Sequence, residues 1–263
     1  MKNRGGNQRV TLNDLCQIIV PALLLVLLAT STVAAPKGEL SLSLMDTLQI
    51  TEGDLRGFTW IGEDTTIVLV AEPDTLRPGF DLTNILYWYD ADGEVIREHD
   101  VTGVLSRGLE YDGKWLWSFA DATEDQEALL YKIEADTLFV DATYPTPGHR
   151  PNDLAWDGTH LWMVDRDSGR LDRFDPETED VTRTRPTPAF SPTGVAFDER
   201  FFWIADLATG RLYRLSRGGS VWNGNVSLET YFHRGEDVTL AWNGGALWII
   251  PQDGGIIIRS QIE

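Results

Sequence analysis

Residues 154–162 read LAWDGTHLW, and three further stretches repeat this pattern: LEYDGKWLW at 109–117, VAFDERFFW at 195–203 and LAWNGGALW at 240–248. In each stretch an aromatic residue is followed by Asp or Asn and, six positions after the aromatic, by Trp. The four tryptophans follow one another at intervals of 45, 41 and 45 residues. A period of about 40–50 residues indicates one supersecondary unit that is copied along the chain.

One such unit, residues 153–188, predicts four short antiparallel strands. The pair Asp157-Gly158 is typical of a tight hairpin turn, and prolines follow the later segments. The expected strands are 154–156, 160–164, 171–174 and 181–185. Four short strands in about 40 residues are typical of one blade of a β-propeller.

The chain contains five such units, and a separate apolar strand precedes them at 39–50. The last unit stops after its third strand, so pairing it with the N-terminal strand would remove two exposed strand edges. We therefore predict an all-β fold: a single closed β-propeller of four-stranded antiparallel blades, five in number, in which the N-terminal strand completes the last blade. The expected blades are 57–103, 108–148, 153–188, 194–235, and 239–263 together with 39–50.

The first 35 residues predict an export segment. Basic residues precede an apolar run at 18–29, and small residues follow, which is the layout of a secretory signal. The run is shorter than the roughly 20 residues that cross a bilayer as a helix. Two interpretations stay open: a secretory signal that is removed, or an uncleaved N-terminal membrane anchor. Either one predicts that the propeller, residues 36–263, is exported to a periplasmic or extracellular location.

The chain is acidic, with 22 basic and 41 acidic side chains and a net charge of −19. A nucleic-acid partner needs clustered Lys and Arg, so the charge argues against one. It also argues against membrane contact beyond the N-terminal segment. We expect a monomer whose partner is a small-molecule or protein ligand. The single cysteine, Cys16, lies in the N-terminal segment, so no disulfide is expected in the propeller.

The repeated aromatic residues have a structural explanation. Each repeated Trp lies inside a strand beside apolar neighbours, so we interpret it as packing between adjacent blades. The polar residue after each aromatic is interpreted as a turn residue; these are Asp112, Asp157, Asp198 and Asn243. Three tryptophans outside the repeated positions are better candidates for exposed contacts: Trp88, Trp115 and Trp222.

Ligands of propellers usually bind at a mouth of the central channel, where the loops before the innermost strands meet. The side chains expected there as ligand-binding residues are Arg56, Arg107, Arg150, Asn152, Thr193 and Arg234. Arginines at such a mouth suit a ligand with a carboxylate or phosphate, because a guanidinium binds planar anions with two hydrogen bonds. The alternative is that these arginines pair with acidic residues of neighbouring blades.

Acidic side chains near the same mouth raise the possibility of catalysis or metal binding. The candidate catalytic residues are Glu72, His149 and Asp237, because carboxylates and imidazole act as acids and bases. Ca²⁺ or another divalent cation would bind oxygen ligands, and the candidates for these are Glu72, Asn152, Asp165, Asp206 and Asp237. The competing interpretation is that Asp in a Gly-containing turn serves the backbone alone.

The frame DLAWDGTHLWMVDRDSGRLDRFD at 153–175 resembles the repeats of NHL-type, SMP-30/gluconolactonase-type and glutamine-cyclotransferase-type propellers, without resolving one family. Likeness to SMP-30-type lactonases implies a divalent metal at the channel mouth. In that case Asn152 matches one ligand motif, Thr193 stands where the family has Asn, and Asp237 lies one residue from the Asp position. Likeness to glutaminyl cyclases implies a catalytic glutamate, for which Glu72 is the counterpart.

Two functions therefore stay open from the sequence. The first is an exported propeller that acts as a ligand- or protein-binding module through its channel-mouth face. The second is a glutamine-cyclotransferase-like or SMP-30-lactonase-like enzyme with its active site at the same mouth.

Overall fold

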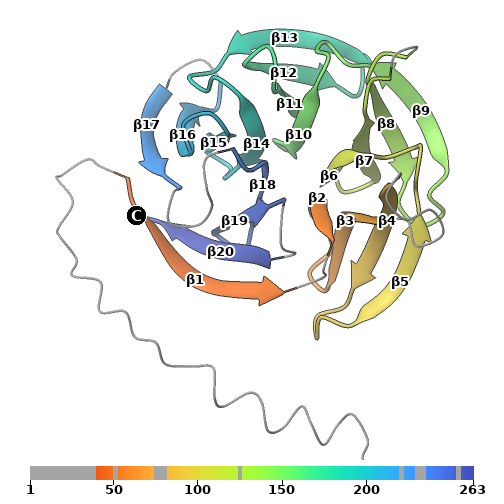
Figure 1. Ribbon diagram of the computed structural model, residues 1–263. Helices are drawn as coiled ribbons and strands as arrows, with labels where there is room; N and C mark the ends of the chain where they lie inside the picture. The colour runs from red at the N-terminus through yellow and green to blue at the C-terminus, as the bar shows by residue number, and fades with distance from the viewer. Residues whose placement is uncertain are drawn as a thin grey trace, which may run out of the picture. The chain divides into compact units, whose positions relative to one another are not determined.

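The computed structural model describes residues 40–49, 53–73, 82–123, 126–218, 222–228, 235–252 and 256–263. In these ranges, strands β1 to β20 form five four-stranded antiparallel sheets arranged around a ring (Figure 1). The prediction of an all-β, five-bladed propeller is confirmed. None of the described segments is a helix long and apolar enough to cross a membrane. The predicted export segment lies outside the described residues.

The blades follow one another along the chain. Blade 1 contains β2 (Asp54–Ile61), β3 (Thr65–Pro73), β4 (Leu82–Tyr89) and β5 (Val95–Asp100). Blade 2 contains β6 (Arg107–Tyr111), β7 (Trp115–Ala120), β8 (Leu129–Glu134) and β9 (Val140–Pro145). Blade 3 contains β10 (Pro151–Trp156), β11 (Leu161–Asp165), β12 (Arg170–Asp175) and β13 (Asp180–Pro186). Blade 4 contains β14 (Pro192–Phe197), β15 (Phe201–Asp206), β16 (Arg211–Ser216) and β17 (Trp222–Ser227).

Blade 5 is built from both ends of the chain, as the sequence predicted. It contains β18 (Val238–Asn243), β19 (Ala246–Pro251) and β20 (Ile256–Ile262), and β1 (Leu42–Gln49) is its outermost strand. Strand β1 pairs antiparallel with β20, from Leu42 opposite Ile262 to Gln49 opposite Ile256. Backbone hydrogen bonds between Ser41 and Glu263 extend this pairing. The ring is therefore closed by hydrogen bonds within one sheet.

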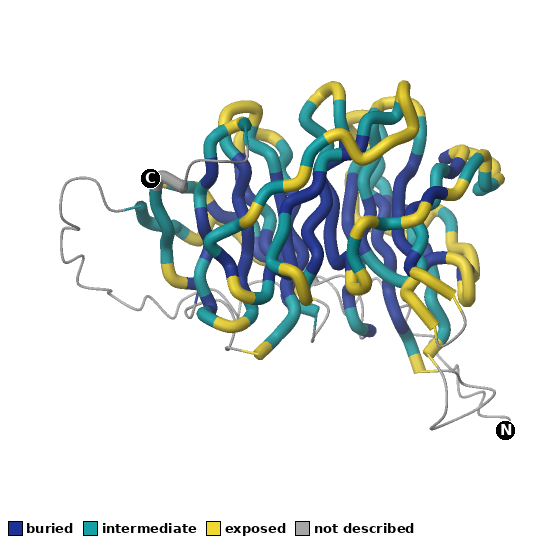
Figure 2. The backbone as a smooth tube through the Cα atoms, turned by 90° about the horizontal axis from the view of Figure 1, so that it is seen from above, coloured by how far each residue is buried: buried dark blue, intermediate teal, exposed yellow. Residues whose placement is uncertain are grey.

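The first strand of each blade lines the central channel. These innermost strands, β2, β6, β10, β14 and β18, contact one another around the ring. Figure 2 shows that the strand interiors are buried while the loops at both faces are exposed. We call the face with the loops that lead into the innermost strands the mouth face. The opposite face, where the first and second strands join, is the hairpin face.

A hydrogen bond explains the repeated spacing between the turn Asp and the Trp. In blades 2, 3 and 4 the indole Nε1 of the repeated Trp donates to Oδ2 of the turn Asp, at 2.8, 2.7 and 2.7 Å; the pairs are Trp117–Asp112, Trp162–Asp157 and Trp203–Asp198. Oδ1 of the same Asp accepts two backbone amides of the turn. These three tryptophans are at most 2% exposed, so the packing and turn interpretations agree with the structure.

Blade 5 offers a natural control, because Trp248 donates to the backbone oxygen of Asn243, not to its side chain. We expect Asp198→Ala to lower the free energy of unfolding by about 2 kcal/mol, since it leaves the buried Trp203 Nε1–H without its acceptor. Asn243→Ala should cost less than about 0.5 kcal/mol, as is usual for a substitution that removes no such partner. Urea unfolding followed by tryptophan fluorescence measures both changes. Equal losses in the two variants would contradict this role of the carboxylate.

One prediction about the remaining tryptophans is wrong. Trp88 is 5% exposed and belongs to the core between blades 1 and 2, because β4 places it beside Ile67 of β3. Trp115 is half-buried, and the ammonium groups of Lys114 and Lys132 lie over its ring. The side chain of Trp222 lies outside the described residues.

Candidate functional site at the channel mouth

Three side chains predicted to surround the channel mouth share one structural feature. The pairing of the innermost strand with its neighbour skips each of these residues, which are Arg56, Asn152 and Thr193. In blade 2 Arg107 pairs with Phe119, and the irregularity follows it, between Arg107 and Glu110. A β-bulge changes the direction of a side chain and ends regular pairing. Val238, the corresponding residue of blade 5, pairs regularly with Pro251. The bulges thus present polar side chains from blades 1 to 4 at the same level of the ring.

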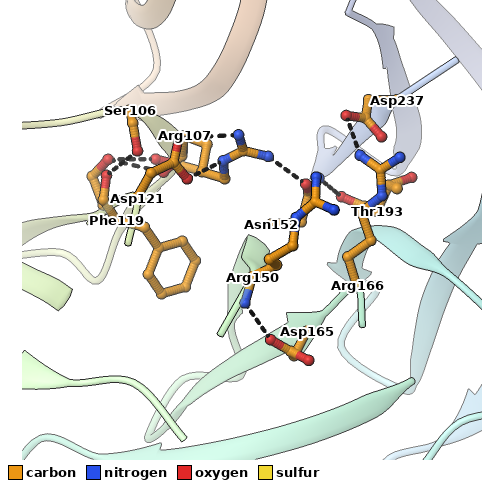
Figure 3. Close-up of polar contacts among 12 residues, drawn as sticks. Ser106, Arg107, Phe119, Asp121, Arg150, Asn152, Asp165, Arg166, Thr193 and Asp237 are labelled. Carbon is orange, nitrogen blue, oxygen red and sulfur yellow. Dashed lines mark hydrogen bonds and ion pairs between the residues drawn. The ribbon is translucent and has the colours of Figure 1, made fainter. Parts of the chain in front are cut away.

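Arg107 links two blades at the mouth (Figure 3). Its Nη1 donates to Asn152 Oδ1 at 2.8 Å, and its Nη2 donates to Asp121 Oδ2 at 3.1 Å. Nε lies 2.7 Å from Asp121 Oδ1, which completes a two-point ion pair. Asn152 in turn donates from Nδ2 to the backbone oxygen of Thr193, and Thr193 Oγ1 accepts from the amide of Val238. Asn152 and Thr193 therefore hold blades 2 to 5 together.

A second chain of contacts joins blades 3, 5 and 1. Arg166 Nη1 donates to Asp237 Oδ2 at 2.8 Å across the mouth (Figure 3). The side-chain amide of Gln252 is oriented so that both its nitrogen and its oxygen have partners. In this orientation the nitrogen donates to Asp237 Oδ2 at 3.1 Å. Its oxygen then accepts from Arg56 Nη1 and Nη2 at 3.2 and 3.0 Å. Arg56 also pairs with Asp54 at 3.2 Å.

The mouth arginines have carboxylate partners. Arg56 and Arg107 both pair with carboxylates, as the second interpretation expected, but the carboxylates belong to their own blades. Arg166, which sequence analysis did not select, forms an ion pair between blades with Asp237. Arg150 is more exposed, with its guanidinium 3.6 Å from Asp167 and both side chains about half exposed. Arg234 lies outside the described residues.

Asp165 and Asp206, two of the candidate metal ligands, both accept hydrogen bonds from backbone amides. Asp165 accepts the amides of Arg150 and Ser168, and Asp206 accepts the amide of Ser191 at the equivalent position. Burial opposes ionisation of Asp165, but these hydrogen bonds outweigh it and hold its pKa below the usual value. No group of three or more His, Cys, Asp or Glu side chains is arranged to bind a metal within the described ranges.

The three candidate catalytic residues are distributed over different environments. Glu72, at the end of β3, accepts a hydrogen bond of 2.8 Å from the hydroxyl of Tyr87. Burial, followed by this hydrogen bond, raises the pKa of Tyr87 above its usual value. Asp237 is engaged by Arg166, whereas His149 is exposed in the loop before β10. The described contacts include none that joins Glu72 or His149 to Asp237.

Sequence analysis missed two acidic residues that lie inside the channel. Asp153 is 1% exposed, and burial raises its pKa to about 8. Burial, followed by the charge of Asp153, raises the pKa of Glu110 well above its usual value. A signal was present in the repeats, because Glu110 occupies the position of Ala155, Ala196 and Ala241 in the other stretches.

Comparison with known proteins shows the fold alone. No protein-family model matches the chain, and no curated protein matches it. Among solved structures, the crystal structure of the Myxococcus xanthus glutaminyl cyclase is similar to the chain with a TM-score of 0.65 and 10% sequence identity. The similarity covers 84% of this chain and 96% of that one.

Proposed function

We propose that the protein is an exported binding module whose mouth face binds a positively charged segment of a partner protein. The observation that carries this proposal is the unequal exposure of the paired charges. The side chains of Asp54 and Asp121 are 39% and 46% exposed, whereas those of Arg56 and Arg107 are each 16% exposed. At these two pairs the face therefore presents carboxylates to an approaching partner, whereas Arg150 and Asp167 are exposed to a similar extent. The net charge of the chain is −19. The negative electrostatic potential of these carboxylates and of the whole chain favours association with a cationic segment.

The pairing at the mouth favours a surface-bound segment over a small ligand that enters the channel. Arg107, Asn152 and Thr193 bind one another, and Arg166 binds Asp237. A small ligand placed between these groups would have to replace their hydrogen bonds, whose loss costs about 1–3 kcal/mol for each buried group left unpaired. A segment that lies across the rim would leave these bonds intact.

An exposed aromatic side chain on the mouth face supports a protein partner. Phe190, in the loop before β14, is 78% exposed. Aromatic side chains that become buried on association are typical anchors of protein interfaces. Together with the exposed carboxylates of the mouth face, Asp54 and Asp121, Phe190 would favour a segment that combines basic and apolar residues. Export rests on the composition of the first 35 residues, which resembles a secretory signal.

The test compares two sets of charge-neutralising substitutions on opposite faces. We expect the mouth variant Asp54→Asn/Asp121→Asn/Asp167→Asn to bind a fluorescent Arg- and Phe-containing peptide about tenfold more weakly than the unaltered protein, given 0.2–1 kcal/mol for each exposed pair. The hairpin-face variant Glu63→Gln/Glu94→Gln/Glu177→Gln changes the net charge equally and should bind almost unchanged. Fluorescence anisotropy at low and high salt measures both. Equal weakening in the two variants would show a non-specific charge effect and contradict the proposal.

Cyclisation of an N-terminal glutamine is the second candidate function. It is favoured by Glu72, which lies at the mouth face with its carboxylate hydrogen-bonded to Tyr87, and by the similarity in fold to a glutaminyl cyclase. A peptide with N-terminal Gln would be converted to the pyroglutamyl peptide with release of ammonia, and mass spectrometry would detect the loss. Activity in the unaltered protein but not in Glu72→Gln would favour this enzyme. If the peptide is not converted, the cyclase function is excluded and the binding function is the candidate that stays.

A further inference from the structure

Asp153 occupies a position at which the other blades have small residues. In the repeats it aligns with Gly57, Gly108, Gly194 and Thr239. The innermost strands lie close together at this level, because a Cβ atom added to Gly194 would lie 2.6 Å from the carbonyl oxygen of Val238. Glycine permits such a close approach of two backbones. Blade 3 alone places a carboxyl group here.

One oxygen of the Asp153 carboxyl group joins three blades. Asp153 belongs to β10 of blade 3, and its Oδ2 accepts the amide of Val195 in β14 at 2.9 Å and that of Leu240 in β18 at 3.0 Å. Both amides lie on the edge strand of a sheet, on the side where the sheet itself supplies no acceptor. The Asp153 side chain is 1% exposed, so water does not compete freely for these bonds. Asp153 therefore fixes the innermost strands of blades 3, 4 and 5 relative to one another.

The residue directly before Asp153 extends this connection to the mouth face. Asn152 donates to the backbone oxygen of Thr193 in blade 4 and accepts from Arg107 in blade 2 (Figure 3). Arg107 in turn holds Asp121, one of the exposed carboxylates of the mouth face. A shift of β10 after loss of the Asp153 contacts would therefore move Asn152 and release the pair of Arg107 and Asp121.

We propose that Asp153 is the positioning residue of the mouth face: its carboxyl group holds blades 3, 4 and 5 together and thereby sets the place of the Asp121 carboxylate that a basic partner meets. As a buried residue it acts on the partner through Asn152 and Arg107, not by contact. The last step of this inference rests on the proposed function. The positioning itself is a property of the unbound protein and can be measured without a partner.

Four variants separate positioning from general stability. Asp153→Ala removes the acceptor of both amides, whereas Asp153→Asn keeps an oxygen that can accept them. Gly194→Ala leaves Asp153 in place but adds a Cβ atom that would lie 2.8 Å from Leu240 Cγ and 3.1 Å from the Leu240 amide nitrogen, so β18 must move. Asp198→Ala is the control, because Asp198 binds Trp203 at the hairpin face and its loss should destabilise the fold without moving the mouth. If Asp153→Ala does not fold, Gly194→Ala provides the same test.

Hydrogen exchange followed by mass spectrometry measures the positioning in the unbound protein. In Asp153→Ala and Gly194→Ala, we expect fragments with the mouth loops 105–107 and 190–193 to exchange about tenfold faster, since these loops open locally. The hairpin turns 112–115 and 157–160 should keep their rates. Asp153→Asn should exchange like the unaltered protein, and Asp198→Ala should leave the mouth loops unchanged. Equal acceleration on both faces, or none at the mouth, overturns the role of Asp153.

A double-mutant cycle measures the last step with the Arg- and Phe-containing peptide. Asp121→Asn should weaken binding about two- to fivefold in the unaltered protein, as for one exposed charge. Asp153→Ala should weaken it by a similar factor, and Asp121→Asn should then add almost nothing, because the carboxylate is no longer held in place. In the Asp198→Ala background, Asp121→Asn should keep its full effect.

The outcomes separate this inference from the proposed function. Additive losses from Asp153→Ala and Asp121→Asn would overturn the coupling between the two residues, although the peptide binds. If the unaltered protein does not bind the peptide, the proposed function fails, and hydrogen exchange alone decides whether Asp153 positions the mouth face.

Discussion

A chain that lacks residues 2–49, and with them β1 (Leu42–Gln49), is expected to lose cooperative folding. This strand is the outermost strand of blade 5, and seven of its residues are paired with β20. Leu40 and Leu42 also pack against the core between blades 4 and 5. Without β1, the edge of β20 and this apolar surface would be exposed. Because a typical domain is stable by only about 5–15 kcal/mol, we expect aggregation or a broad, non-cooperative transition.

The comparison for this experiment is a chain that lacks residues 2–39 and keeps β1. Both chains lose the export segment, so a difference between them reports on the strand alone. Size-exclusion chromatography and urea unfolding followed by tryptophan fluorescence measure the effect. The shorter deletion should elute as a compact species and unfold in one sharp transition. If the chain without β1 behaves in the same way, closure by the N-terminal strand is not essential to the fold.

The free energy of unfolding is expected to fall as the pH rises from 5 to 8. Burial raises the pKa of Asp153 to about 8 and raises that of Glu110 well above its usual value. Between the unfolded and folded pKa values, the folded state holds protons that the unfolded state releases. The stabilisation is therefore complete below about pH 4 and is lost as the pH approaches 8. For each proton the slope is at most about 1.4 kcal/mol per pH unit.

Asp153→Asn should flatten this slope, because the amide oxygen can still accept from Val195 and Leu240 while the titrating group is gone. Asp165→Asn is the matched control, since hydrogen bonds hold the pKa of Asp165 below its usual value. A carboxyl group with a lowered pKa stabilises the folded state above its unfolded pKa, and this stabilisation is lost only in acid. The slope above pH 5 should therefore persist in Asp165→Asn. Urea unfolding at several pH values gives the slopes. An unchanged slope in Asp153→Asn would contradict the assignment of the titration to this residue.

The fold could be predicted because its determinants are local and repeated. The turn Asp and the Trp five positions later form one hydrogen-bonded unit, and this unit recurs in blades 2, 3 and 4. The positions at the mouth could also be predicted, because each lies at a fixed distance before the repeated aromatic. Arg56, Asn152 and Thr193 are each skipped by the pairing of the innermost strand, and in blade 2 the irregularity directly follows Arg107.

The partners of these side chains could not be predicted, because they depend on distances across the channel. The pair between Arg166 and Asp237 joins residues 71 positions apart, and no repeat pattern places these two residues near each other. Glu110 and Asp153 were missed for a different reason. They occupy positions inside the innermost strands, and a comparison of what the repeats share does not pick out a residue that differs in one blade alone.

Closure of blade 5 has a consequence for how the protein is made. The hydrogen bond between Ser43 and Glu263 joins residues 220 positions apart, so the first described strand along the chain pairs with the last described one. Until β20 has been synthesised, β1 lacks this partner and the ring stays open. Blades 1 to 4 can form in sequence, since their strands are consecutive along the chain. During that interval β1 of one chain can pair with β20 of another, so the synthesis of β20 is the step at which a single closed ring competes with an intertwined pair of chains.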